Sequence, residues 1–187
     1  MCETNLTNEQ RKILLSVARD TIHTKAFHQT LPEFDFNDEI FTEKRGGFVT
    51  LHKKGELRGC IGYVFAYHPL LDTIIEMAEA AAFRDPRFPS VEQYEIDDLD
   101  IEISVLSPLK KIENVEEIEI GVHGIMLEKG TNTGLLLPQV APEWGWNRTE
   151  FLERTCQKAG LAKNEWKKSE TTIKIFSADI FSEKDFS

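Results

Sequence analysis

The chain has 187 residues, of which 41% are hydrophobic and 29% are charged, and this balance is typical of a globular protein rather than a disordered or membrane protein. The 22 Lys and Arg residues face 32 Asp and Glu residues, which gives a formal net charge of -10. Such an excess of acid repels phosphate backbones, and no apolar run approaches the roughly 18 residues needed to cross a bilayer. We therefore expect neither nucleic acid nor a membrane as a partner.

The cysteines indicate a reducing compartment. Cys2, Cys60 and Cys156 are odd in number and far apart in the chain, and residues 1–5 lack the basic-then-apolar plan of a secretory signal. We therefore expect a cytoplasmic location.

The first half of the chain predicts two helices around a β-hairpin. Thr7 and Gln10 form a capping-box pattern, which predicts a helix over residues 8–29. The periodicity is lost over residues 31–44, where we expect an irregular crossing. The hydrophobic pattern then predicts strands on both sides of a glycine-containing loop within residues 47–65. A second helix follows Pro69 and ends near residue 83.

The second half of the chain predicts mainly short strands. Residues 99–106 alternate between apolar and polar side chains, as half-buried strands do. Further segments predict three short strands in a small meander, a helix ended by Gly160 and a final strand, over residues 116–121, 123–129, 133–137, 149–159 and 171–180. Helices and antiparallel strands interleave without βαβ repetition, so the predicted fold class is α+β.

The most function-like stretch is the LRGCIG motif at residues 57–62. It joins a permanent cation, Arg58, to a thiol, Cys60, and to two glycines, Gly59 and Gly62, that allow close approach of a ligand. One hypothesis makes Cys60 a nucleophile beside Arg58, because alternate positions of a strand share a face. The alternative is a buried small hydrophobe between two bulge glycines, since free cysteine is among the most buried residue types.

The sequence offers little support for a catalytic base or a cofactor. His68 and His123 are the nearest candidates for a base, and neither forms a known thiol-enzyme pattern with Cys60. No spacing matches a zinc or calcium site, and the glycines match neither a dinucleotide fingerprint nor a phosphate loop. We therefore expect no metal and no cofactor.

A proline-stiffened loop over residues 84–89 is the second candidate region. Arg84, Asp85 and Arg87 could clamp a carboxylate or phosphate, because guanidinium forks bind such groups in a bidentate manner. The alternative is a structural ion pair that fixes the loop to the sheet. Glu102 and Ser104 share the polar side of their strand and are pocket residues only if that side faces the motif.

Two tryptophan residues in a loop form a third candidate region for function. Trp144 and Trp146 flank Gly145 in a proline-punctuated segment. They provide either a patch for a partner or ordinary rim packing.

Six segments in the correct order resemble the AMMECR family, named for the Alport syndrome and elliptocytosis candidate-region protein. The resemblance covers nearly the whole chain. The segments are LRGCIG at 57–62, FRDPRF at 83–88, EISVL at 102–106, Gly121 with Gly124, LLPQV at 136–140 and KAGL at 158–161 before Trp166.

The resemblance implies a single domain over residues 1–187 built from two interleaved parts. The larger part would hold an antiparallel sheet flanked by helices, and a smaller second subdomain would form a cleft with it that holds the LRGCIG motif. The family has no established reaction, so the resemblance carries over no catalytic role. Its prokaryotic members are linked to a Memo-like protein and to a radical S-adenosylmethionine (SAM) enzyme, which implies a component of a modification pathway.

Three functions stay open at this point. The first is a non-catalytic module that binds a ligand or one of those partners at the motif, and the second is a thiol-dependent enzyme with Cys60 as nucleophile and Arg58 orienting an anionic substrate. The third places function on the Trp144 and Trp146 loop. The pocket of the first two would be lined by Gly59, Ile61, Gly62, Arg84, Asp85, Arg87, Glu102 and Ser104.

Overall fold

The structure of the chain is a computed structural model that describes residues 6–34, 36 and 38–186. Cys2 and the N-terminal residues that support the expected location lie outside this part. The chain forms two compact units, and residues 107–178 are inserted between the two segments of the larger unit, which lie within residues 5–106 and 179–187. Each unit has its own sheet and its own hydrophobic core.

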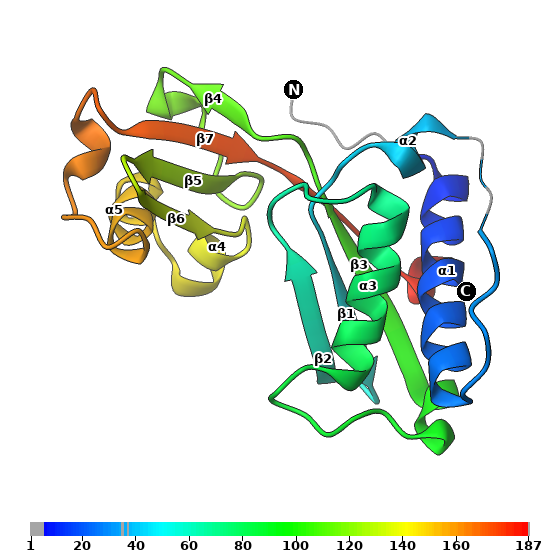
Figure 1. Cartoon of the computed structure of the whole chain (residues 1–187). Helices are drawn as coiled ribbons and strands as arrows, with labels where there is room; N and C mark the ends of the chain where they lie inside the picture. Colours follow the sequence, from blue (N-terminus) through cyan, green and yellow to red (C-terminus); the bar gives the residue numbers. More distant parts are fainter. Residues whose placement is uncertain (1–5, 35, 37, 187) are drawn as a thin grey trace. The chain divides into compact units, whose positions relative to one another are not determined.

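The larger unit is a four-stranded sheet with two long helices packed on one face (Figure 1). The strand order is β2-β1-β3-β8, and β1 runs antiparallel to both β2 and β3. The strands are β1 (Gly47–Lys53), β2 (Glu56–Tyr63), β3 (Leu99–Leu106) and β8 (Ala178–Ser182), and the helices are α1 (Asn8–Ala26), the short α2 (Glu39–Thr42) and α3 (Leu70–Phe83).

Local sequence explains why these elements form. The Thr7 hydroxyl accepts a hydrogen bond from the Gln10 N–H, and the Gln10 side chain accepts one from the Thr7 N–H, so the predicted capping box is confirmed. Lys54 and Gly55 have positive φ angles of 54° and 87°, as the two-residue turn between β1 and β2 requires. The predicted helix start and hairpin are therefore both confirmed.

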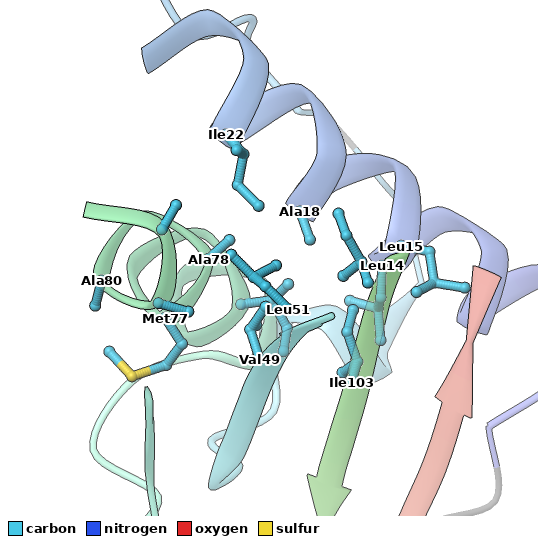
Figure 2. Close-up of a cluster of buried hydrophobic side chains, with 14 of the residues drawn as sticks. Leu14, Leu15, Ala18, Ile22, Val49, Leu51, Met77, Ala78, Ala80 and Ile103 are labelled. Atoms are coloured by element: carbon cyan, nitrogen blue, oxygen red, sulfur yellow. The ribbon is translucent and has the colours of Figure 1, made fainter. Parts of the chain in front are cut away.

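The core of the larger unit lies between the helices and the sheet. Figure 2 shows Leu14 and Ile22 of α1 pointing toward Val49, Leu51 and the other buried side chains beneath them. All four of these side chains are fully buried. Because each large aliphatic side chain contributes about 1.5–3 kcal/mol when buried, this layer fixes which face of the sheet the helices cover.

The smaller unit has a second four-stranded sheet, with the order β4-β7-β5-β6. Its elements are β4 (Lys110–Ile112), β5 (Gly124–Lys129), β6 (Asn132–Leu136), β7 (Thr172–Phe176), α4 (Val140–Trp144) and α5 (Arg148–Lys158). Both units also contain short 3-10 turns: η1 (Gln93–Asp98), η2 (Val115–Glu117), η3 (Glu165–Lys167) and η4 (Glu183–Phe186).

Two of the predicted strands are wrong in detail. Residues 116–121 form turns instead of a strand, because the Asn114 side chain caps the Glu116 N–H and Gly121 has a φ of 85°. The final strand, predicted over residues 171–180, is interrupted at Ser177, whose backbone N–H donates to the Ser107 hydroxyl. Two strands in different sheets replace it. The sequence patterns also missed β4, α4 and the short α2, which lies within residues 31–44, where an irregular crossing was expected.

The predicted α+β class is confirmed by helices packed on antiparallel sheets. The expected cleft stays a prediction. Among the described residues, no helix is both long and apolar enough to cross a membrane.

Candidate functional site

The LRGCIG motif forms most of β2, which lies at one edge of the larger sheet (Figure 1). Pairing with β1 runs without interruption from Tyr63 to Gly59, which lies opposite Leu51. The next pair is His52 with Leu57, so the strand bulges at Arg58. The bulge breaks the two-residue alternation that predicted a shared face for Arg58 and Cys60.

Close packing explains both glycines of the motif. An added Cβ at Gly59 would lie 2.1 Å from the Ala81 carbonyl oxygen, so only glycine lets α3 approach the strand this closely. An added Cβ at Gly62 would lie 2.2 Å from the Phe48 ring. Both glycines therefore have a packing role that needs no ligand.

Arg58 is bound to the protein itself. Its guanidinium donates to the two carboxylate oxygens of Glu95 at 3.1 and 2.9 Å, and to the carbonyls of Pro89 and Ser90 at 2.9 and 3.3 Å. Its side chain is 11% exposed. Lys53 adds a third bond to Glu95 at 2.8 Å. These hydrogen bonds, those from Arg58 first, lower the pKa of Glu95 to about 2.

A second buried carboxylate, that of Asp85, binds the backbone at the outer edge of β2. The Cys60 N–H donates to Asp85 at 2.9 Å, and the Arg87 guanidinium donates to the Cys60 carbonyl at 3.1 Å. Arg87 also donates to both carboxylate oxygens of Asp85, at 3.0 and 2.7 Å. Its hydrogen bonds hold the pKa of Asp85 well below its usual range. The loop after α3 is therefore fixed to the sheet by an Asp85–Arg87 ion pair.

The Cys60 thiol lies on the face of the sheet that the long helices leave uncovered. Cys60 is paired with Thr50, whose hydroxyl donates to the sulfur at 3.2 Å, and Thr50 is paired in turn with Glu102 on β3. One row further, Phe48 pairs with Gly62 on one side and Ser104 on the other. We call this surface the open face; its half-buried side chains are Phe48, Thr50, Cys60, Glu102 and Ser104.

The predicted site residues are thus divided among different surroundings. Cys60, Glu102 and Ser104 share the open face, whereas Ile61 packs against the helix-covered core. Arg84 is exposed, and its side chain makes no hydrogen bond or ion pair with any described residue. The structure does not bring Arg58 and the Cys60 thiol together. The remaining members, Gly59, Gly62, Asp85 and Arg87, have the packing and edge contacts described above.

Neither predicted base hydrogen bonds to the thiol. His68 is exposed at the start of α3, and the Nδ1 of His123 accepts a hydrogen bond from the Glu119 N–H. Within residues 6–34, 36 and 38–186, no group of three His, Cys, Asp or Glu side chains could hold a metal ion. The open face can therefore bind through hydrogen bonds and apolar contact, with a thiol among its groups.

A groove of about 590 Å³ lies where α1 and α3 end against the 90–94 segment. Its lining includes Phe83, Ser90, Val91 and Tyr94, and no residue of the LRGCIG motif lines it. Arg58 nevertheless supports one wall, because it binds the Ser90 carbonyl and Glu95 just beyond the segment. The motif thus holds the groove in shape without forming its surface.

Sequence reasoning missed the partners that define the motif. Glu95 was not singled out, although it is 8% exposed and binds two cations, and neither was Thr50. The signal for Glu95 was its place three residues after Glu92, with which it forms a capping box at the start of η1. The signal for Thr50 was its place opposite Cys60 in the hairpin.

The tryptophan loop combines one exposed ring with one half-buried ring. Trp144 is 70% exposed and stacks on Trp146 with ring centroids 5.9 Å apart. The Arg154 guanidinium lies 5.4 Å from the Trp146 centroid. Trp146 therefore packs at the rim of the smaller core, and Trp144 is open to a partner.

Comparisons with known proteins decide the family. The AMMECR1 family model matches residues 15–181. The chain belongs to the AMMECR1 family. A Methanothermobacter thermautotrophicus protein is 46% identical over 95% of this chain and 96% of its own length, and a Methanosarcina barkeri protein is 42% identical over 96% and 93%. The resemblance stated from the six sequence segments is confirmed.

A crystal structure from the AMMECR1 family supports the same fold. Uncharacterized protein PH0010 from Pyrococcus horikoshii matches with a TM-score of 0.78 and 38% identity, over 96% of this chain and 94% of that chain. The names of these AMMECR1 relatives state no substrate or reaction. The family and the α+β fold are therefore shown, and function has to be argued from the site.

Proposed function

We propose that this AMMECR1-family protein is a non-catalytic, cytoplasmic binding module that docks a protein partner through the open face beside the LRGCIG motif. The observation that carries the proposal is the engagement of Arg58 by Glu95 and two carbonyls. A guanidinium that orients a substrate must have free donors, whereas this one is 11% exposed and bound inside the unit. The cation of the motif therefore serves structure.

The surroundings of the thiol also favour binding over thiol catalysis. A cysteine nucleophile is activated by an adjacent base or cation. The Cys60 sulfur accepts a hydrogen bond from a neutral hydroxyl, that of Thr50, and Arg58 is directed to Glu95 instead. We expect Cys60 in a Cys2→Ser background to react with iodoacetamide at neutral pH no faster than a free model thiol. A faster reaction would reopen the enzymatic alternative.

The open face has the composition of a docking surface. Half-buried Phe48 and Cys60 supply apolar contact, Ser104 and Glu102 supply polar groups, and Leu57 at the near end of β2 is 41% exposed. We propose the Memo-like protein and the radical SAM enzyme linked to the family as the partners. In this proposal the protein is one component of their modification pathway.

Charge reversal on the open face tests the proposal. The Memo-like protein and the radical SAM enzyme are each titrated against the full chain by calorimetry. We expect Glu102→Lys to weaken the binding of at least one of them about tenfold or more, since a misplaced charge at an interface costs several kcal/mol. Glu56→Lys is the matched control, because Glu56 is exposed at the start of β2 and the change in charge is the same.

Circular dichroism first verifies that each variant is folded, and the binding data then distinguish the possible outcomes. Weakening by Glu102→Lys with normal binding of Glu56→Lys supports docking at the open face. Equal binding of both variants and the parent chain refutes it, as does failure of the parent chain to bind either partner.

A further inference from the structure

The outward backbone groups of β2 differ in their hydrogen bonding between Cys60 and Gly62. The Cys60 N–H and carbonyl point away from β1, because they bond to Asp85 and Arg87 on the far side of the strand. Backbone direction repeats every two residues in an antiparallel strand, and the register with β1 is continuous here. The Gly62 N–H and carbonyl therefore also point outward.

The Gly62 edge is open where the Cys60 edge is closed. No described residue makes a hydrogen bond to the outward N–H or carbonyl of Gly62, and β2 is a terminal strand of its sheet. Unpaired edge groups are the template to which extended peptides add. The Asp85–Arg87 pair ends this template at Cys60, so the site accepts a short segment only.

Exposed aromatic rings continue from the open edge. Phe65 and Tyr67 are 37% and 57% exposed, and their ring centroids are 5.8 Å apart. Tyr67 also meets the ring of Tyr63, the last residue of β2, edge to face at 5.8 Å. A strand added at Gly62 would place an apolar side chain within reach of these rings.

One exposed cation beside this edge is not balanced by a carboxylate. Arg84 is exposed, and its side chain makes no hydrogen bond or ion pair with any described residue, whereas the charge of Arg87 is balanced by Asp85. Arg84 lies near the edge, because it directly precedes Asp85, whose carboxylate binds the Cys60 N–H. In a chain of net charge -10, this cation favours a segment that carries a carboxylate.

We propose that the β2 edge at Gly62 binds a short, extended peptide segment of a protein partner, one that carries an acidic side chain beside an apolar one. The partner's backbone pairs with Gly62, its apolar side chain packs on Phe65 and Tyr67, and its carboxylate meets Arg84. This inference rests on the proposed binding function and adds the chemistry of the segment that is bound.

Nuclear magnetic resonance of the full chain provides the test. The probe is an acetylated, amidated hexapeptide of alternating valine and glutamate, and a valine–lysine peptide is its counterpart. We expect saturable binding of the acidic peptide with slower exchange of the Gly62 amide and shifts of the Phe65 and Tyr67 resonances. No saturable binding, equal binding of the lysine peptide, or shifts confined to another surface would overturn the proposal.

Variants of exposed arginine and lysine residues isolate the charge. Arg84→Glu should weaken acidic-peptide binding about fivefold, the scale of one exposed ion pair. Lys54→Glu makes the same change in charge at the β1–β2 turn and should leave binding unchanged. Equal effects of Arg84→Glu and Lys54→Glu would contradict a specific contact.

A second copy of this chain could also pair with the edge, and sedimentation at each protein concentration tests this alternative. If the Gly62 amide is protected only when the protein is a dimer, the edge binds a second copy and the proposal is overturned.

The two proposals fail in different ways. If Glu102→Lys abolishes partner binding while no peptide binds the edge, docking at the open face stands and the edge inference is wrong. If the acidic peptide binds at Gly62 while Glu102→Lys leaves partner binding intact, the edge inference stands and docking at the open face is wrong.

Discussion

The backbone N–H of Cys60 donates a 2.9 Å hydrogen bond to the buried carboxylate of Asp85. Arg87 closes the ring, because it binds both the carboxylate and the Cys60 carbonyl. The pair thus satisfies the two peptide groups that a neighbouring strand would otherwise satisfy, and it does so with side chains from the loop after α3. A segment that looks like a connecting loop in the sequence is therefore part of the sheet edge.

Removing the Asp85 charge should loosen this edge. We expect Asp85→Asn to lower the free energy of unfolding by about 1–3 kcal/mol, because the variant weakens two bonds of a buried side chain, one from the Arg87 guanidinium and one from the Cys60 N–H. Chemical denaturation measures the loss, and hydrogen exchange should show a faster-exchanging Cys60 amide. Asp98→Asn is the control, since Asp98 is exposed, and it should change stability by less than about 0.5 kcal/mol. Equal effects would mean that the edge contacts contribute nothing specific.

We expect that lysine cannot replace Arg58 without a loss of stability. Arg58→Lys keeps the charge but loses the planar fork that binds Glu95 and two carbonyls together, so we expect a loss of about 2–4 kcal/mol in unfolding free energy. Denaturation of Arg58→Lys, Glu95→Gln and the double variant gives the coupling energy, which should be about 1–3 kcal/mol. Arg84→Lys should be nearly neutral, because Arg84 is exposed and forms no ion pair within the described part of the chain. Additive losses in the cycle would contradict the pairing.

Local patterns predicted the elements whose determinants lie close together in the sequence. The capping box at Thr7 and Gln10 starts α1 at the predicted residue, and Gly160, with a φ of 73°, follows the end of α5 as predicted. The hairpin turn at Lys54 and Gly55 is likewise predicted from neighbouring residues. Each of these signals depends on bonds that span only a few residues.

Contacts between distant segments could not be predicted in this way. Glu95 lies 37 residues after Arg58, and nothing local marks it as the partner of the motif. The bulge at Arg58 depends on the register with β1, and the interruption at Ser177 depends on Ser107, 70 residues earlier. The sequence could therefore single out the LRGCIG motif as a candidate, but the division of its residues between structure and surface required the fold.

The two buried carboxylates predict a dependence of stability on pH. Their pKa values are lowered in the folded state, to about 2 for Glu95, so the ionised forms stabilise the fold above their ordinary pKa values and that stability is lost as pH falls. We expect the free energy of unfolding to be level above about pH 5 and to fall between about pH 5 and pH 2. In Glu95→Gln it should start lower at pH 7 and fall less steeply. Parallel curves for the two proteins would show that Glu95 does not titrate as described.

Alanine at the two glycines of the motif should be destabilising for different reasons, and a second substitution can tell them apart. Gly62→Ala forces a Cβ against the Phe48 ring, so we expect a loss of about 1–3 kcal/mol that Phe48→Ala partly restores. Gly59→Ala forces a Cβ against the Ala81 carbonyl, which is a backbone group that no side-chain substitution can remove. We therefore expect a loss above about 3 kcal/mol that Phe48→Ala does not relieve. Denaturation of the parent, the three single variants and the two double variants measures the losses and the coupling. Rescue of Gly59→Ala by Phe48→Ala would refute the assignment of Gly59 to the contact with Ala81 and of Gly62 to the contact with Phe48.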